Sequence, residues 1–429
     1  MILKKFYNLG KFKFSKIYRS ITGKGNLRTL KLIKQEFPEL KIKYFKSGTK
    51  VFDWVIPAEW NVKDAYVKDK YNKKIIDFKK NFLSLVGYSI PKKIILSKDE
   101  LIKKLYTQTD LPDTIPFVTS YYKKYYGFCI SENFKKKIIK KYKKKDKFKI
   151  NIDSSFNNKG KMYYGELVIK GKSEQEILIS TYICHPLMAN NEISGPIVSM
   201  CLINHFRKTK PNKTLRFIFI SETIGSISYL SKNLKFLQTK CIGGFNLSCI
   251  GDEKMYSYMP SRNKNSISTK SIEEAYKKLK INAKKFSYLQ RGSDERQYNS
   301  PGIDLDIASI FRSKYGKYKE YHTSADDFNL VTLKGIAGGF KVAKQAIIIL
   351  SNKIIPKSKL LCEPQLSKRN LYSSISKKNK HQKLSLKILN FLTYADGKNE
   401  IKDISKMIKL NEFETYKIYK LLKKNNILI

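Results

Sequence analysis

Four nearly continuous apolar segments, separated by amphipathic helical patterns, constrain the fold of this chain most strongly. The segments are EILISTYIC (176–184), TLRFIFISE (214–222), GGFNLSCIG (243–251) and DLDIASIFR (304–312). Helical patterns lie between them, near residues 192–208, 224–235 and 271–281. Strands that are buried on both faces have continuous apolar sequences, whereas strands with one solvated face alternate. The sequence therefore predicts an α/β fold with a mostly parallel, mixed sheet sandwiched by helices.

Two further units are predicted beside this sheet. Over residues 48–115, β-branched and aromatic residues alternate with polar ones between turn residues, which indicates a small inserted β-rich domain. The α/β domain then comprises residues 1–47 and 116–355, and KFKINIDSSF and KMYYGELVIKG within it are predicted to form a hairpin. After a polar, lysine-rich linker around 354–382, three helical patterns over 380–429 predict a winged-helix or helix-turn-helix domain. Such a domain can contact either DNA or a protein partner.

The formal charge of +50 would ordinarily favour a polyanionic partner such as nucleic acid. Only nine of the 86 basic residues are arginine, however, and arginine is the residue preferred for bidentate phosphate recognition. A general compositional bias toward lysine explains this surplus, and attraction to anionic partners remains the alternative.

Targeting and redox features of the sequence are few. No run of eighteen apolar residues and no signal-peptide pattern occurs, so we expect a cytoplasmic protein without a transmembrane segment. The six cysteines form no CxxC pair, which argues against a zinc knuckle or a disulfide framework. Oligomerisation is left open by the sequence.

Polar residues follow two of the predicted strands. In parallel sheets, ligands bind at the carboxyl ends of the strands, where His185 and Glu222 fall. His185, followed by Asn191 and Glu192, is suited to holding a cation, and the alternative is a hydrogen-bonded loop histidine. Glu222, beside an apolar sheet, is suited to general-base catalysis, and the alternative is a carboxylate favoured by a helix N-terminus.

Two later loops supply more candidates. The first loop, GSDERQYNSPGID, contains Asp294, Glu295 and Arg296. The second, KEYHTSADDF, contains His322. The chain has only four histidines, and of the other two, His205 lies in a helical pattern and His381 in the predicted linker. A histidine-based metal site can therefore be built in few ways.

Taken in order, the motifs HP…NNEISG, ISETIGSISYL, FNLSCIG, GSDERQYNSPGID and YHTSADD resemble those of the zinc aminopeptidase and glutaminyl cyclase clan. More closely, SGTKVFDWVIPAEW, IPFVTSYYKKYYGFC and STYICHPLMANNEISGP resemble a bacterial aminopeptidase-like family of undefined function. The resemblance covers nearly the whole chain. It implies a zinc-peptidase-like fold with an inserted small β domain and a C-terminal winged helix, in a family often linked to surface polysaccharide biosynthesis.

The resemblance also assigns residues by position. In the clan, two zinc ions are held by two histidines and three carboxylates, and a further glutamate is the base. Carried over, the histidines are His185 and His322, and the base is Glu222. The three carboxylate positions are occupied here by Asn191, Thr223 and Ser248. An intact two-zinc site is therefore not expected, and the resemblance implies one ion at most.

Two functional hypotheses follow. The first is a zinc-dependent, aminopeptidase-like hydrolase of an amide or peptide-like bond in a small substrate, such as a polysaccharide-related molecule. Its site residues would be Glu222 as the catalytic base, His185, His322, Glu192 and Asp294 as metal ligands, and Asn191, Arg296 and Glu295 as substrate-binding residues. The second is a degenerate peptidase-fold binding or regulatory protein whose C-terminal domain contacts DNA or a protein partner.

Overall fold

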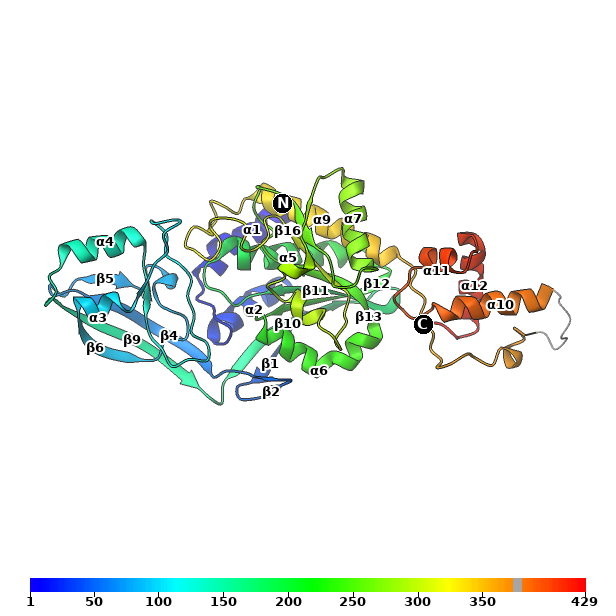
Figure 1. Cartoon of the computed structure of the whole chain (residues 1–429), viewed down its shortest axis with the longest axis horizontal. Helices are drawn as coiled ribbons and strands as arrows, with labels where there is room; N and C mark the ends of the chain where they lie inside the picture. Colours follow the sequence, from blue (N-terminus) through cyan, green and yellow to red (C-terminus); the bar gives the residue numbers. More distant parts are fainter. Residues whose placement is uncertain (373–379) are drawn as a thin grey trace.

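The computed structural model describes residues 1–372 and 380–429, with the side chains of 380–383 excepted. The predicted linker around 354–382 and the side chain of His381 therefore lie partly or wholly outside the described residues. Figure 1 shows an inserted β unit at one end, a central α/β domain, and a helical C-terminal unit at the other end. None of the described helices combines the length and the apolar character needed to cross a membrane.

Within the described residues, the central sheet has eight strands in the order β1-β10-β12-β11-β13-β16-β14-β15. Their bounds are β1 Lys41–Lys46, β10 Lys161–Ile169, β12 Lys213–Ile220, β11 Ser173–Tyr182, β13 Cys241–Leu247, β16 Ile307–Phe311, β14 Ser257–Met259 and β15 Lys284–Lys285. The four central strands β12, β11, β13 and β16 are parallel to one another. β1 and β10 pair antiparallel to their neighbours, whereas β14 is antiparallel to β16 and parallel to β15. The predicted α/β fold with a mixed central sheet is confirmed.

Helices cover both faces of this sheet (Figure 1). One face packs on α1 Ile2–Phe12, α2 Lys24–Glu36, α5 Ser194–Phe206, α7 Ile267–Leu279 and α9 Leu333–Asn352, and the other on α6 Ile224–Lys240. Successive residues of β11 alternate between the two cores: Ile177 and Ile179 belong to the first, and Leu178 to the second. This burial on both sides explains why the central strands are continuously apolar in sequence.

The inserted unit is built on a four-stranded antiparallel sheet of order β5-β4-β9-β6. Its strands are β4 Glu59–Lys68, β5 Lys74–Asp77, β6 Lys92–Ser97 and β9 Lys147–Asn157, and α4 Glu132–Lys141 lies above it. The central strand β9 lies outside the predicted range 48–115, so this sheet is completed by a later segment. The exact boundaries of the domains stay a prediction.

The predicted hairpin of KFKINIDSSF with KMYYGELVIKG is wrong. The first segment, β9, pairs with β4 and β6, whereas the second, β10, pairs with β1 and β12. The turn between them lies where the chain passes from one sheet to the other. Two neighbouring strands joined by a turn normally pair, and nothing local in the sequence indicates that each finds a partner elsewhere.

The C-terminal unit contains α10 Lys380–Thr393, α11 Ile401–Met407 and α12 Glu412–Lys424. Part of the predicted linker belongs to this unit: Lys357 and Ser358 form β-bridges with Asp396 and Leu428, and Leu366 is buried in its core. Leu360 and Leu371 pack against the same core, so three apolar residues anchor a segment whose composition is mainly polar.

Candidate active site

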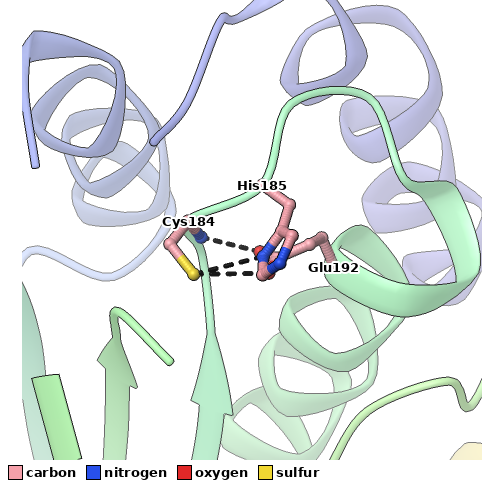
Figure 2. Close-up of side chains that lie close together, drawn as sticks. All are labelled: Cys184, His185 and Glu192. Atoms are coloured by element: carbon pink, nitrogen blue, oxygen red, sulfur yellow. Dashed lines mark hydrogen bonds and ion pairs between the residues drawn. The ribbon is translucent and has the colours of Figure 1, made fainter. Parts of the chain in front are cut away.

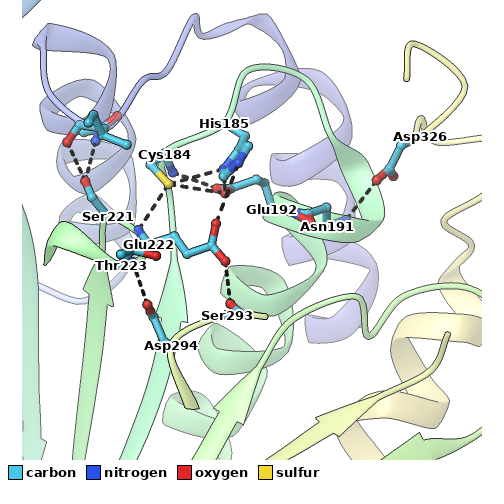
Figure 3. Close-up of polar contacts among 12 residues, drawn as sticks. Cys184, His185, Asn191, Glu192, Ser221, Glu222, Thr223, Ser293, Asp294 and Asp326 are labelled. Carbon is cyan, nitrogen blue, oxygen red and sulfur yellow. Dashed lines mark hydrogen bonds and ion pairs between the residues drawn. The ribbon is translucent and has the colours of Figure 1, made fainter. Parts of the chain in front are cut away.

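The candidate site lies at the carboxyl ends of the central strands, as the sequence predicts (Figure 3). His185 follows β11 and Glu222 follows β12. His322 lies in the loop between β16 and α9, and Asp294 precedes the short helix α8, Glu295–Tyr298. Parallel neighbouring strands bring these sequence-distant loops to one edge of the sheet.

A buried pair formed by His185 and Glu192 is the centre of the site (Figure 2). His185 Nδ1 is in direct hydrogen-bond contact with Glu192 Oε1, and the Cys184 backbone N–H donates to Glu192 Oε2 at 2.7 Å. A π-helical turn, Ala189–Ile193, turns Glu192 back toward the end of β11. Burial disfavours the charged imidazole, but the Glu192 carboxylate outweighs it, so the pKa of His185 is raised.

This pair fixes the orientation of the imidazole. With Nδ1 on Glu192, Nε2 faces Glu222, whose Oε2 lies 3.8 Å away. Metal-ligating histidines commonly donate their second ring N–H to a carboxylate in this way. Glu192, predicted as a metal ligand, contacts the opposite ring nitrogen, Nδ1, through a hydrogen bond.

Cys184 completes a compact group. Among the described residues, Cys184, His185 and Glu192 are the group of three or more potential ligands whose donor atoms all lie within 4.8 Å of one another. Burial raises the pKa of the Cys184 thiol well above its usual range, and its sulfur accepts the backbone N–H of Glu222 at 3.2 Å. The Cys184 sulfur also lies 3.3 Å from His185 Nδ1 and 3.5 Å from Glu192 Oε1, so the three side chains form one hydrogen-bonded group.

Glu222 combines burial with one defined hydrogen bond. Ser293 Oγ donates to Glu222 Oε1 at 2.6 Å, which leaves Oε2 directed toward His185. Burial raises the pKa of Glu222, and His185 and Ser293 oppose this only in part. A carboxylate with a raised pKa and one free oxygen is suited to accept and return a proton.

His322 is the second histidine that lies close to the site. Its ring lies 5.3 Å from the His185 ring between centroids and stacks on Tyr321 at 3.9 Å. Burial, with a smaller effect of His185, lowers the pKa of His322 to about 3, so the imidazole is neutral. Its Nε2 is buried and has no hydrogen-bond partner among the described residues. The backbone φ of 55° is unusual for a non-glycine residue, which indicates that the surrounding loop imposes this position.

The segment around Phe117 covers the two histidines, a role that the sequence did not reveal. The Phe117 ring lies 4.8 Å from His185 and 5.2 Å from His322, and its backbone N–H donates to the His322 carbonyl at 2.8 Å. Pro116 also forms a β-bridge with Thr323. The only sequence signal was the position of this segment within a motif shared with the resembled family.

The loop carrying Asp294 supports the site from below (Figure 3). Asp294 Oδ1 accepts the Thr223 N–H at 2.7 Å and the Ser226 hydroxyl at 2.9 Å, which ties the loop to the start of α6. Burial, followed by the charge of Glu222, raises the pKa of Asp294 to about 8. Predicted as a metal ligand, Asp294 is engaged with helix α6 through one oxygen, while its other oxygen is buried without a partner among the described residues.

Glu295 and Arg296, predicted to bind substrate, differ in exposure. Glu295 is fully buried and accepts the N–H groups of Gly292 and Ser293, both at 2.9 Å, together with the Tyr315 hydroxyl at 2.6 Å. It therefore holds the loop that presents Ser293. Arg296 is exposed and donates to Thr223 Oγ1 at 2.8 Å, so it lies at the edge of the site.

Asn191 and Ser248 occupy positions where the resembled clan has carboxylates. Both are buried, and Asn191 Nδ2 and Ser248 Oγ have no partner among the described residues. The Asn191 backbone N–H donates to Asp326, whose pKa is raised to about 7 by burial. Neutral groups at these positions supply none of the negative charge that a second divalent cation requires. These positions therefore do not fit a second ion.

Solved structures of aminopeptidases share this fold. A zinc aminopeptidase from Bacillus subtilis matches with a TM-score of 0.58 at 12% identity, over 81% of this chain and 93% of that one. A peptidase M28 precursor from Shewanella amazonensis matches with a TM-score of 0.59 at 11% identity, over 85% and 95%. Identities this low show the fold alone, which is that of an aminopeptidase-like α/β protein.

Relatives of higher sequence identity show which family this chain belongs to. A family model described as a domain of unknown function, DUF4910, matches residues 8–353, and a winged helix-turn-helix model matches 354–429. A Clostridium acetobutylicum protein named for polysaccharide biosynthesis and an aminopeptidase-like domain is 37% identical over 404 residues, which are 93% of this chain and 90% of that protein. A solved structure of a peptidase candidate from the same species has a TM-score of 0.78 at 34% identity, over 100% and 96%. The chain belongs to the DUF4910 family and carries a C-terminal winged helix, which confirms the resemblance.

We predict that Glu192→Gln destabilises the protein strongly. The change removes the negative charge that faces His185 and the buried Arg19, and a buried charge left without its partner costs roughly 3 kcal/mol. Urea unfolding should show a lower midpoint. Glu39→Gln is the matched control. Glu39 forms an exposed ion pair with Arg207 at 3.8 Å, and exposed pairs contribute little, so the midpoint should change little.

Asp294 should make the native protein less stable as pH rises from about 4 to about 8. Burial raises the pKa of Asp294 in the folded protein to about 8 from its ordinary value of 3.8, so over this range the unfolded chain releases a proton that the folded chain retains. Asp294→Asn mimics the protonated side chain and should flatten this part of the pH dependence. Urea midpoints at pH 5 and pH 8 measure the effect; an equal fall in both proteins would contradict the assignment.

Proposed function

We propose that this protein is a zinc-dependent hydrolase of an amide or peptide-like bond that uses a single ion. The observation that carries the proposal is the arrangement around His185, whose Nδ1 is held by Glu192 while Nε2 faces Glu222 at 3.8 Å. A carboxylate at this distance from the metal-binding nitrogen lies close enough to act on a water molecule held by the same ion. The neutral, buried and unpartnered Nε2 of His322 supplies a further donor.

His185 and His322 would hold the ion, and Glu222 would be the catalytic base. Zinc supplies Lewis-acid polarisation and lowers the pKa of bound water. Glu222 would accept a proton from the attacking water at Oε2 and return it to the leaving nitrogen as the C–N bond breaks. Ser293 fixes the other carboxylate oxygen. Phe117 covers the histidines and limits the access of bulk water to this side of the site.

Substrate recognition is proposed for the edge of the site. Arg296, exposed beside Thr223, is placed to bind an acidic or hydroxyl group, and the unpartnered amide of Asn191 is placed to donate to a carbonyl. Glu295 acts on substrate only through the loop it holds. The name of the Clostridium relative makes an amide on a sugar derivative a suitable first substrate class. A cytoplasmic location and any oligomeric state remain predictions.

Purified protein should contain close to one zinc ion per chain, measured by elemental analysis. The double variant His185→Ala, His322→Ala should lose it, because both imidazole donors are removed. His205→Ala is the matched control: this histidine is partly buried on α5 and contacts Phe206 and Phe340, away from the site. A metal-free protein that still binds a ligand after the double change would overturn the hydrolase and support the alternative binding or regulatory function.

Glu222→Gln should separate catalysis from metal binding. The amide keeps the size of the side chain and its hydrogen bond with Ser293 but cannot accept the proton, so kcat should fall by a factor on the order of 10² to 10⁴. Zinc content should remain close to that of the native protein. The assay would use aminoacyl anilides and N-acylated amino sugars, and unchanged kcat would exclude Glu222 as the base.

A further inference from the structure

A cavity lies at the end of the central sheet opposite the candidate active site. It has a volume of about 670 Å³ and separates the α/β domain from the C-terminal unit. Gln175 in β11 and Cys241 at the start of β13 line one wall, so the cavity is at the amino ends of strands whose carboxyl ends carry the active site. Lys357 and Lys398, from the C-terminal unit, also line the cavity. The volume is within the range typical of small-molecule sites.

The acidic residues of this interdomain cavity are already engaged. Asp304 forms an ion pair with Arg262, and Asp396 accepts the backbone N–H groups of Lys398 and Asn399. Asp306 accepts the Ser268 N–H at the start of α7 at 3.0 Å. None of these carboxylates pairs with the side chain of a cavity lysine in the described structure.

Two cations, in contrast, have no partner. Lys264 and Lys398 are exposed residues at the edge of the cavity, and their ammonium groups form neither an ion pair nor a hydrogen bond with any of the described residues. Lys264 comes from the loop before α7, and Lys398 comes from the C-terminal unit. The cavity therefore retains an excess of positive charge, with contributions from both walls.

The remaining lining is mixed. The amide side chains of Asn263 and Asn265 line the cavity, whereas those of Gln238 and Asn299 already donate to backbone carbonyls. Apolar side chains are contributed by Ile242, Ile267, Ile303 and Leu305. Amides suit hydroxyl groups, and the apolar side chains suit the faces of a ring or carbon skeleton. A phosphate ester carries close to two negative charges at neutral pH, which matches the two unpaired lysines.

We propose that this interdomain cavity binds a small organic phosphate ester, with the phosphate held between Lys264 and Lys398 and the hydroxylated part against the amide side chains. Such a ligand would touch both units at once. The two units are already joined by Lys353, which pairs with Glu274 at 2.8 Å and Glu400 at 2.9 Å, and by Lys270, which pairs with Asp403 at 2.9 Å. Binding would add a further connection, so occupancy would favour the arrangement in which the winged helix contacts the α/β domain. This inference does not depend on the proposed hydrolase activity.

Calorimetric titration of the full chain tests the proposal, with glucose 6-phosphate as the probe and glucose as its uncharged counterpart. Glucose 6-phosphate should bind at least about tenfold more tightly than glucose, because charge-assisted hydrogen bonds are the stronger ones. The double variant Lys264→Gln, Lys398→Gln should weaken its binding by about tenfold or more. Equal binding of the two probes, or no binding of glucose 6-phosphate, would overturn the proposal.

The matched control is Lys136→Gln, Lys137→Gln, which removes the same charge from exposed positions of α4 in the inserted unit. It should leave binding unchanged, and an equal loss in control and test variants would overturn the proposal by showing a general charge effect. Hydrogen exchange locates the ligand independently. Glucose 6-phosphate should protect residues 261–265 and 396–398 together. Protection at 185–192 and 293–296 instead would place the probe in the active site and contradict the assignment.

Discussion

The buried contact between His185 and Glu192 is the interaction on which the site depends. It fixes one imidazole nitrogen, directs the other toward Glu222, and links the end of β11 to the π-helical turn that follows. Glu192 is in turn held by the Cys184 N–H and by the nearby charge of Arg19, a fully buried residue of the N-terminal segment. A buried carboxylate is stable here only because several groups compensate its charge.

Distant parts of the chain therefore meet at this one edge of the sheet. The strands supply His185 and Glu222, the loop before α8 supplies Ser293, and the segment that returns from the inserted unit supplies Phe117. Each is anchored by backbone hydrogen bonds or by buried carboxylates such as Asp294 and Asp326. Burial disfavours the charged form of these two acids, so their pKa values are raised. The packing of the two large cores offsets this unfavourable free energy.

Much of this arrangement could be predicted from the sequence because its signals are local. Four apolar strands with intervening helices specified the sheet, and the positions of His185 and Glu222 at strand ends followed from its parallel order. The role of Glu192 could not be predicted, since a carboxylate seven residues after a histidine suits either a metal ligand or a hydrogen-bond partner. The outcome depends on a π-helical turn that no propensity indicates. The pairing of β9, the anchoring of Leu366 and the covering position of Phe117 are likewise decided by contacts between segments far apart in the chain.

Anomalous X-ray diffraction at the zinc edge tests the central claim most directly. Crystals grown with zinc should show one anomalous peak per chain, bound by Nε2 of His185 and by His322, with Glu222 adjacent and Glu192 still hydrogen-bonded to His185 Nδ1. Two peaks, or a single peak bound by Glu192 and Cys184, would contradict the account.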